Sequence, residues 1–554
     1  MCRPSIGIAS PAQKEKVMIR FPAVLSLAVT FGFFPCANAT PQPCEQLARL
    51  ALPNTKITSA QTVAAGAFSP PPGASPWLIG DPSLYKQLPA FCRVTADDKP
   101  TPDSDIKIEV WMPASGWNGK FRGQGNGGFA GEMDYRALAV AILQGYASAS
   151  TDTGHAASGV DATWALGHPE KIIDFAYRAI HEMTSLSKAA VKAFYGDAPK
   201  HSYFASCSNG GRQALMEAQR YPEDYDGILA GAPANYWTHL LSSALWDAQA
   251  TTLDPDSYIP SSKVPAIAQA VLAACDTKDG LKDGIVNDPR QCHFDPAAML
   301  CKQGNSDSCL TQPQVTALKK LYEGAHDSKG QPIFPGFVPG AEEGQGGWGT
   351  WITGNAPGKA LLFAFGNGFF GNMVYEQADW DYKKAKLDDA VAAADQKFAA
   401  VLNSTEPNMK AFQAHGGKLI LYHGWNDPGI SPLSSINYYE SVLATMGKPQ
   451  ADSFVRLYMV PGMQHCAGGP GPDEFGEFGI SPVNDPQHNM YLALEQWTEK
   501  GTAPSTVIAS KIDGAIPAGP GTKAKMTRPL CAYPQTAKYK GTGDSNDATN
   551  FACE

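Results

Sequence analysis

Predicted strands and helices alternate along most of this chain, and this alternation limits its possible folds more than any other feature. Runs typical of strands lie at 106–112, 146–151, 201–206, 228–233, 418–423 and 454–460. Patterns typical of helices lie between or after them, at 172–194, 211–220, 434–446 and 489–500. Strands that alternate with helices form a mostly parallel sheet with helices on both faces. We therefore expect an α/β fold with a doubly wound, mostly parallel sheet.

The alternation is lost between residues 236 and 399. This stretch contains four cysteines, an aspartate-rich loop and a segment rich in glycine and aromatic residues from Gly344 to Tyr375. The α/β pattern resumes after it, which indicates that this stretch is inserted into one α/β core. We predict a lid domain at 236–399 and a core domain formed by 40–235 together with 400–554.

The beginning of the chain resembles an export signal. An apolar run from Phe21 to Phe34 follows three basic residues and ends at Ala37-Asn38-Ala39, a small-x-small cleavage pattern. The run is shorter than the roughly 20 residues that span a bilayer. We predict that 1–39 is a cleaved signal and that the mature protein is secreted or periplasmic, with no membrane attachment. A start at Met18 would give a more typical signal length.

The cysteine count agrees with export. Two of the 12 cysteines precede the predicted cleavage point, and the even number that remains suggests five disulfides. No Cys-x₂-Cys or paired histidine spacing favours zinc instead. Spacing favours three short loops and leaves two further pairs by elimination. The predicted pairs are Cys275–Cys292, Cys301–Cys309, Cys531–Cys553, Cys44–Cys92 and Cys207–Cys466.

Charge and composition exclude two broad classes. The net charge of −9 and the lack of a basic cluster argue against a nucleic-acid-binding protein. A hydrophobic content of 43% with 18% charged residues argues against a disordered chain. The protein is expected to be a soluble, acidic, loop-rich globular protein.

A candidate nucleophile lies between a predicted strand and a predicted helix. The run Ser206-Cys207-Ser208-Asn209-Gly210-Gly211 has the context of a nucleophile elbow, in which a tight turn exposes a serine hydroxyl at the sheet edge. Ser206 replaces the first glycine of Gly-x-Ser-x-Gly, although it is still small. Taken alone, the run fits an ordinary serine- and glycine-rich turn equally well.

Two partners follow in the expected order. Asp427 and His465 each come just after a predicted strand, at the edge where parallel sheets build their sites. Catalysis requires Ser208 and His465 within hydrogen-bonding reach of each other. Their neighbours Cys207 and Cys466 would then lie close enough to form a disulfide, which agrees with the pairing by elimination.

These motifs resemble the tannase and feruloyl esterase family. The matching segments are Cys207–Arg212, Tyr225–Pro233, Asp427 in its His-Gly-x-x-Asp context, and His465-Cys466. The resemblance implies an α/β-hydrolase core with a large inserted lid domain, and its relatives include a mono-hydroxyethyl terephthalate hydrolase. It also implies that Ser208 is the nucleophile, His465 the general base and then acid, and Asp427 the group that orients the imidazole.

The glycine-rich run 121–129 follows an early predicted strand. By itself it fits a flexible loop, and a phosphate cradle is poorly supported without the Walker lysine and serine. The resemblance implies that the N–H of Gly128, or alternatively that of Gly127, forms an oxyanion hole with the N–H of Asn209.

The aspartate-rich loop suggests a calcium site. Carboxylates and backbone carbonyls are the ligands that calcium prefers, but the spacing differs from an EF-hand, with Asn287 where a glutamate is expected. A solvated acidic turn is the alternative. The resemblance implies a structural Ca²⁺ held by the carboxylates of Asp276, Asp279 and Asp283 and the carbonyls of Leu281 and Ile285. No organic cofactor is expected.

The lid suggests the substrate class. Its segment 344–375 is rich in aromatic residues, which would suit a phenolic acyl group, although most aromatic residues in any protein are core. Lys359 is its only charged residue between Glu343 and Glu376, whereas a substrate with a free carboxylate would favour an arginine. We therefore rank hydroxycinnamoyl and galloyl esters above mono-hydroxyethyl terephthalate.

The resulting prediction is a secreted serine carboxylesterase that acts on small esters of aromatic acids. A secreted serine peptidase and a catalytically inactive calcium-binding protein are the alternatives.

Overall fold

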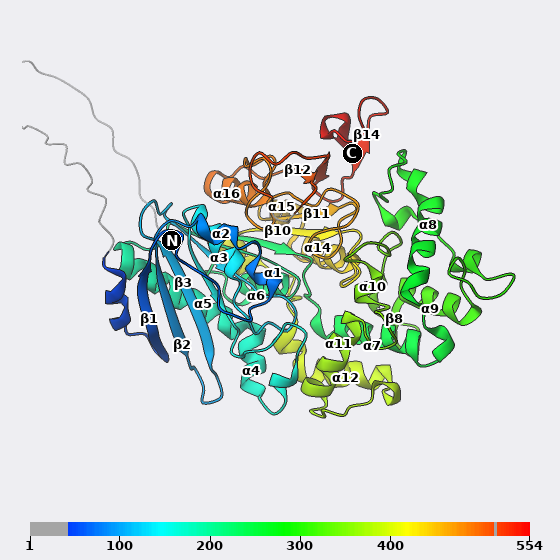
Figure 1. Ribbon diagram of the computed structural model, residues 1–554, viewed down its shortest axis with the longest axis horizontal. Coiled ribbons are helices and arrows are strands. Elements are labelled where there is room, and N and C mark those ends of the chain that lie inside the picture. Colours follow the sequence, from blue (N-terminus) through cyan, green and yellow to red (C-terminus); the bar gives the residue numbers. More distant parts are fainter. Residues whose placement is uncertain (1–41, 515–517) are drawn as a thin grey trace, which may run out of the picture. The chain divides into compact units, whose positions relative to one another are not determined.

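The structure is a computed structural model that describes residues 42–514 and 518–554. A nine-stranded sheet forms its centre (Figure 1). The predicted signal at 1–39 lies outside the described residues. In spatial order the strands are β1 (Thr55–Val63), β2 (Phe91–Asp98), β3 (Ile106–Pro113), β5 (Ala147–Thr151), β4 (Lys120–Gln124), β6 (His201–Cys207), β7 (Gly227–Gly231), β10 (Lys418–Gly424) and β11 (Val455–Val460). The strands from β5 to β11 pair in parallel, whereas β1, β2 and β3 join them antiparallel at one edge.

The α/β prediction is therefore confirmed. The predicted strands correspond to β3, β5, β6, β7, β10 and β11, but the sequence patterns had not identified β1, β2 or β4. The glycine-rich run follows the predicted strand β3, as expected, but its first residues belong to β4, which was not predicted. Gly123 lies within this strand and not in a turn. A glycine is required there because a Cβ would lie 2.2 Å from the Tyr225 hydroxyl.

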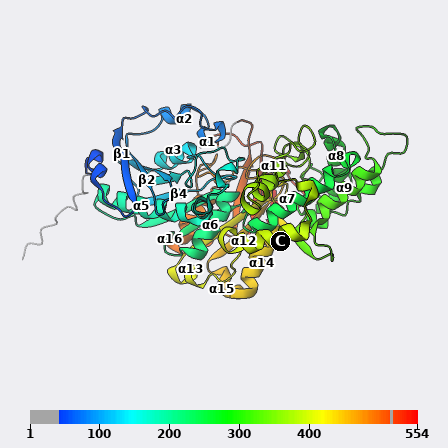
Figure 2. The same cartoon turned by 90° about the horizontal axis from the view of Figure 1, so that it is seen from below.

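Helices cover both faces of the sheet (Figures 1 and 2). One face packs against α5 (Ala179–Tyr195), α6 (Asn209–Arg220) and α14 (Leu433–Met446). The other packs against α3 (Tyr135–Leu143) and α16 (Met490–Lys500). Adjacent strand residues alternate between the two cores: Phe204 and Ile228 lie in the first, and Tyr203 and Leu229 in the second. Burial on both faces explains why these strands are almost continuously apolar.

The long helix predicted at 172–194 is interrupted. It consists of α4 (Pro169–Ile173), a π-helical turn over Asp174–Arg178, and α5. The carboxylate of Asp174 is fully buried and accepts hydrogen bonds from Arg178 and from Ser104 on a distant loop. These contacts stabilise the π-helical turn. The spacing of apolar residues in the sequence does not reveal such a turn.

The segment between β7 and β10 adds no strand to the central sheet. Its elements are α7 (Trp237–Thr252), α8 (Val264–Cys275), α9 (Gln312–Glu323), β8 (Gly324–His326), β9 (Pro332–Pro335), α10 (Trp348–Trp351), α11 (Leu361–Gly368) and α12 (Leu387–Leu402). It has an apolar cluster of its own that contains Ile267, Leu318 and Trp348. A second cluster joins it to the core, where Phe129 packs against Trp237.

The remaining elements lie at the two ends of the core and in its loops. They are α1 (Pro76–Ile79), α2 (Ser83–Lys86), α13 (Lys410–His415), α15 (Lys448–Asp452), β12 (Thr506–Lys511), β13 (Met526–Cys531), β14 (Ala537–Tyr539) and β15 (Phe551–Cys553). Across the described ranges, no helix is both long and apolar enough to cross a bilayer.

Five disulfides link elements that are separate in the sequence. They join Cys44 to Cys92, Cys207 to Cys466, Cys275 to Cys292, Cys301 to Cys309 and Cys531 to Cys553, the same pairs that the sequence suggested. The pair Cys207–Cys466 closes the longest loop, with a sequence separation of 259, and connects the ends of β6 and the β11 loop.

Candidate active site

Ser208 occupies a strained turn between β6 and α6. Its φ of +67° and ψ of −126° lie outside the usual regions for a residue with a side chain. Two hydrogen bonds hold the turn: the N–H of Ser208 donates to the carbonyl of Gly231 at 2.9 Å, and the N–H of Ala234 donates to the carbonyl of Ser208 at 3.1 Å. The half-buried Ser208 therefore lies at the carboxyl end of the parallel sheet, directly before a helix.

The glycines after Ser208 permit close approach of the strand and helix. A Cβ on Gly210 would lie 1.9 Å from the Ser206 Oγ and 2.5 Å from its Cβ. A Cβ on Gly211 would lie 2.3 Å from the carbonyl of Gly231. Ser206 thus fills the space that the first glycine of the usual motif would leave empty, and Gly210 compensates for it.

Asp427 and His465 form a close pair at the same edge of the sheet. The ring Nδ1 of His465 lies 2.7 Å from Asp427 Oδ2, and Asp427 Oδ1 accepts the N–H groups of Gly429 and Ile430 at 2.8 and 2.9 Å. Because a carboxylate only accepts, the Nδ1 of His465 carries the proton, and its Nε2 is left to act as a base when the ring is neutral.

The environment of Asp427 keeps it ionised. The residue is fully buried, and burial alone would raise its pKa. The charge of His465 and hydrogen bonds from His423 and His465 outweigh this effect and hold the pKa of Asp427 well below its usual range. The Nε2 of His423 lies 3.2 Å from Asp427. The sequence analysis includes His423 in the His-Gly-x-x-Asp context of Asp427 but assigns it no role.

The disulfide Cys207–Cys466 connects the neighbours of Ser208 and His465, with a Cα–Cα distance of 6.0 Å. Cys466, like Ser208, has a positive φ, of 64°. Ser208 and His465 line one cavity of about 610 Å³. Among the described residues, no hydrogen bond joins these two side chains. In many substrate-free hydrolases this bond tightens only when substrate binds.

Of the predicted oxyanion residues, Gly128 and the alternative Gly127 line the same cavity, whereas Asn209 is buried directly after Ser208. Gly128 has a φ of +55° and lines it, and Asn209 is the first residue of α6. Within the described ranges, neither N–H donates to another protein group. The glycine loop is tied to α6 because Gln213 accepts the N–H of Asn126 at 2.9 Å and donates to its side chain at 3.3 Å. Sequence reasoning had not identified this link.

Two aromatic residues of the inserted segment reach this cavity. Trp351 and Phe365 line it, and the edge of Trp351 meets the His465 ring with centroids 4.7 Å apart. In contrast, Trp348, Phe369 and Phe370 are fully buried in the apolar clusters of the segment. Only part of the aromatic stretch is therefore available to a ligand.

Two arginines from the core also line the cavity, and sequence reasoning missed both. Arg122 lies over the ring of Tyr491 at 4.3 Å, and Arg136 lies over Trp77 at 4.6 Å. Neither forms an ion pair with an acidic side chain in the part of the chain that the structure describes. The sequence did not point to them because Arg122 is in the unpredicted strand β4 and Arg136 is in the unpredicted helix α3.

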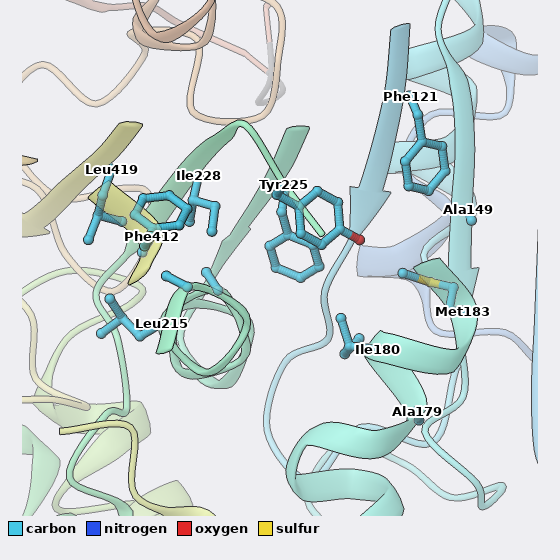
Figure 3. Packing of buried hydrophobic residues seen from close by; sticks show 14 of the residues in the cluster. Phe121, Ala149, Ala179, Ile180, Met183, Leu215, Tyr225, Ile228, Phe412 and Leu419 are labelled. Carbon is cyan, nitrogen blue, oxygen red and sulfur yellow. The ribbon is translucent and has the colours of Figure 1, made fainter. Parts of the chain in front are cut away.

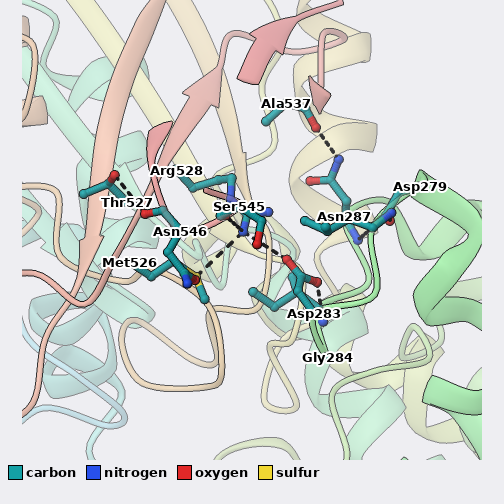
Figure 4. A network of polar contacts seen from close by, with 12 residues as sticks. Asp279, Asp283, Gly284, Asn287, Met526, Thr527, Arg528, Ala537, Ser545 and Asn546 are labelled. Atoms are coloured by element: carbon teal, nitrogen blue, oxygen red, sulfur yellow. Dashed lines mark hydrogen bonds and ion pairs between the residues drawn. The ribbon is translucent and has the colours of Figure 1, made fainter. Parts of the chain in front are cut away.

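The aspartate-rich loop is ordered by its own backbone and by the C-terminal region (Figure 4). Asp276 accepts the N–H groups of Asp283 and Gly284 at 3.2 and 3.0 Å. Asp279 accepts the N–H of Leu281 at 3.0 Å, and the carboxylate of Asp283 pairs with Arg528 of β13 at 3.0 Å. The loop therefore forms a bridge between α8 and the C-terminal strands.

The donor atoms of this loop suit a hard cation. Burial and the charges of Asp283 and Asp276 raise the pKa of Asp279, although hydrogen bonds from backbone N–H groups oppose this. A bound cation would relieve that repulsion. The carbonyls of Leu281 and Ile285 accept no hydrogen bond within the described ranges. The three carboxylates are not within 4.8 Å of one another, since the only such cluster among the described residues lies elsewhere.

The contact between Gly210 and Ser206 gives a testable coupling. Gly210→Ala should lower the free energy of unfolding by about 1–3 kcal/mol, because it overpacks the elbow. Ser206→Gly removes the two atoms that the new methyl group meets, so Ser206→Gly/Gly210→Ala should be more stable than the sum of the single effects predicts. Urea unfolding of the four proteins measures the coupling. Simple additivity of the two changes would contradict the packing argument.

Comparisons with known proteins identify the family of this chain. The family model described as "Tannase and feruloyl esterase" matches residues 92–554. An uncharacterized esterase of Xanthomonas campestris pv. campestris is 43% identical over 95% of this chain and 94% of its own length. A probable feruloyl esterase B of Aspergillus clavatus is 33% identical over 91% of this chain and 94% of its own.

A solved structure gives the same result. The crystal structure of feruloyl esterase B from Aspergillus oryzae superposes with a TM-score of 0.83 and 30% identity, and the match covers 92% of this chain and 99% of that one. The match of the family model over most of the chain, the relatives and the central sheet lead to one conclusion: this chain belongs to the tannase and feruloyl esterase family of α/β-hydrolase esterases.

Proposed function

We propose that this protein is a secreted serine esterase that hydrolyses esters of phenolic aromatic acids, with hydroxycinnamoyl esters as the preferred class. The observation that carries the proposal is the Asp427–His465 contact at 2.7 Å, tied through the Cys207–Cys466 disulfide to the strained Ser208. In this arrangement Ser208 is the nucleophile, His465 the base and Asp427 the group that orients the imidazole.

The reaction follows from these positions. Nε2 of His465 takes the proton of the Ser208 hydroxyl as Oγ attacks the ester carbonyl. The N–H groups of Asn209 and Gly128 stabilise the negative oxygen that forms. His465 then donates the proton to the alcohol as it leaves, and a water molecule, activated in the same way, releases the aromatic acid and restores Ser208.

Several features support an aromatic acyl group and export. Trp351 and Phe365 offer flat apolar surfaces beside Ser208, in the inserted segment that we assign as the lid. The named relatives include a probable feruloyl esterase B, and the family description includes tannase, which keeps galloyl esters as the second choice. Five disulfides suit an oxidising compartment outside the cytosol.

The substrate assignment can be tested with methyl ferulate, methyl gallate and mono-hydroxyethyl terephthalate in parallel. The wild-type protein should hydrolyse methyl ferulate with the highest kcat/KM, and Ser208→Ala should abolish turnover. A fluorophosphonate probe should label the wild type and not Ser208→Ala. Absence of labelling in a folded sample would instead favour the inactive calcium-binding alternative. Labelling without cleavage of any of the three esters would keep the nucleophile and reject the phenolic substrate class.

A second candidate substrate has specific support. Arg122 and Arg136 line the cavity together with Asp134 and Glu477, but neither arginine forms an ion pair with a described acidic side chain. They could therefore bind the free carboxylate of mono-hydroxyethyl terephthalate. In the same assay this function predicts that mono-hydroxyethyl terephthalate is the best substrate. It also predicts that Arg136→Gln raises KM for that ester far more than for methyl ferulate.

Loss of the Cys207–Cys466 disulfide should lower activity more than loss of a disulfide far from Ser208. The double variant Cys207→Ser/Cys466→Ser releases the restraint between Ser208 and His465, and a misplacement near 1 Å costs about 100-fold in rate. We expect kcat/KM for methyl ferulate to fall by about that factor. The control Cys301→Ser/Cys309→Ser opens a disulfide within the inserted segment and should retain normal turnover. Equal losses in both variants would point to general destabilisation.

We also propose that the aspartate-rich loop binds a structural Ca²⁺. The carboxylates of Asp276, Asp279 and Asp283 and the carbonyls of Leu281 and Ile285 would hold it, in keeping with the oxygen donors that calcium requires. The ion would stabilise the bridge between α8 and β13. It has no part in the proposed chemistry at Ser208.

Calcium should therefore raise the thermal stability of the protein. One site saturated 100-fold above its Kd adds about 2.7 kcal/mol to the free energy of unfolding. Addition of EDTA should reverse the gain in Tm for the wild type and for Asp288→Asn, a nearby carboxylate that pairs with Arg290 instead. Asp279→Asn should lose the response. A calcium-dependent Tm that survives in Asp279→Asn would reject this set of ligands.

A further inference from the structure

Three metal-ligating side chains meet on the helical side of the core, outside the cavity that Ser208 lines. His181 is on α5, Glu217 is on α6, and Asp224 is in the loop between α6 and β7. One ligand atom from each lies within 4.8 Å of the other two. Ile180 and Met183 of α5, Leu215 of α6 and Tyr225 belong to one buried apolar cluster (Figure 3), so both helices that carry the site are packed into the core.

Glu217 is the unusual member of this cluster. It is only 1% exposed, and within the described residues neither of its carboxylate oxygens has a hydrogen-bond partner. Buried polar atoms are almost always paired, and an unpaired carboxylate in such a place is costly. Glu217 also lies beside the carboxylate of Asp224, and two ionised carboxylates repel each other unless a cation or a shared proton lies between them. The carboxylate thus lacks a partner that its surroundings should supply.

The nearest ammonium group does not supply that partner. The Nζ of Lys188 donates to the backbone carbonyl of Asp224, and Lys188 forms no ion pair with Glu217 or Asp224 in the described part of the chain. His181 has contact with only one of the carboxylates, since its Nδ1 lies 2.6 Å from Asp224 Oδ2. A cation bound between the imidazole and the two carboxylates would satisfy all three groups.

The donor types select among cations. Calcium and magnesium prefer oxygen ligands alone, whereas one imidazole nitrogen with two carboxylates is a ligand set of zinc and related transition metals. The His181 ring is held flat against Tyr221, with centroids 3.9 Å apart and planes 9° apart, so its orientation is already set. The side chains of His181 and Asp224 are 32% and 15% exposed, which leaves a path for the ion and for a water ligand.

We propose that His181, Glu217 and Asp224 bind one divalent transition-metal ion, for which zinc is the test ion. The ion would join α5 to α6 and to the loop before β7. Since α6 begins directly after Ser208, the site would brace the helix that carries the elbow, without contact to the reacting groups. The inference does not depend on the substrate proposed above.

Zinc binding by the full chain provides the test. The protein is stripped of metal, kept in saturating calcium so that the acidic loop is occupied, titrated with Zn²⁺ by calorimetry, and desalted for metal analysis. We expect one zinc per wild-type chain and a rise in Tm on binding. X-ray absorption at the zinc edge should show one imidazole nitrogen with oxygen ligands and no sulfur.

Two variants and one control make the assignment specific. His181→Ala and Glu217→Gln should each lose the zinc or weaken its affinity at least tenfold. His168→Ala is the matched control, because His168 forms a similar pair with Asp103 at 2.8 Å but has no third ligand. It should bind zinc like the wild type. Near-UV circular dichroism and fluorophosphonate labelling first establish that each variant is folded.

Glu217→Gln is the decisive variant if His181→Ala does not fold, because it keeps the shape of the buried side chain. The proposal is overturned if the wild type takes up no zinc. It is also overturned if a folded Glu217→Gln or His181→Ala protein binds zinc with the stoichiometry and affinity of the wild type. Loss of zinc in His168→Ala but not in His181→Ala would place the ion at the His168–Asp103 pair and would also overturn the proposal.

Discussion

Parallel pairing of β6, β7, β10 and β11 is the constraint on which the rest of the site depends. In this register Cys207 lies opposite Gly231, Tyr422 opposite the same Gly231, and Gly424 opposite Val460. The carboxyl ends of the strands therefore lie together, and the residues that follow them are brought to one edge from positions more than 200 residues apart. The disulfide between Cys207 and Cys466 then secures two of these loops to each other. Backbone pairing selects the neighbours, and the covalent bond limits how far they separate.

Two carboxylates of this core are equally buried but have different hydrogen-bonding surroundings. Asp427 and Glu217 are both removed from water, and burial alone would raise both pKa values. Asp427 remains ionised because two histidines and two backbone N–H groups surround it. Glu217 has no such partners among the described residues. The comparison explains why one group is suited to orient a catalytic base, whereas the other needs a cation or a proton.

Local patterns predicted much of the fold and of the candidate site. The predicted strands β7, β10 and β11 are mostly apolar because both of their faces are buried. Ser208, Asp427 and His465 were identifiable as residues that follow strands. The antiparallel strands β1 and β2 were missed because they are partly exposed and polar at the edge of the sheet, and β4 was missed because Gly123 and Gly125 resemble a turn. The role of His423 was missed because it depends on a contact across the folded loop.

Local spacing along the chain was enough to predict the α/β class, the order of the three candidate catalytic residues, the three short-range cysteine pairs and the acidic loop, whereas the pairs Cys44–Cys92 and Cys207–Cys466 followed by elimination. Only the tertiary structure decided which side chains share a cavity. It brought Arg122 and Arg136 beside Ser208, separated Trp351 and Phe365 from the aromatic residues that merely fill the core, and assembled His181, Glu217 and Asp224 from two helices and a loop. Such groupings depend on how helices pack across a twisted sheet, and contacts of that kind leave no periodic signal along the chain.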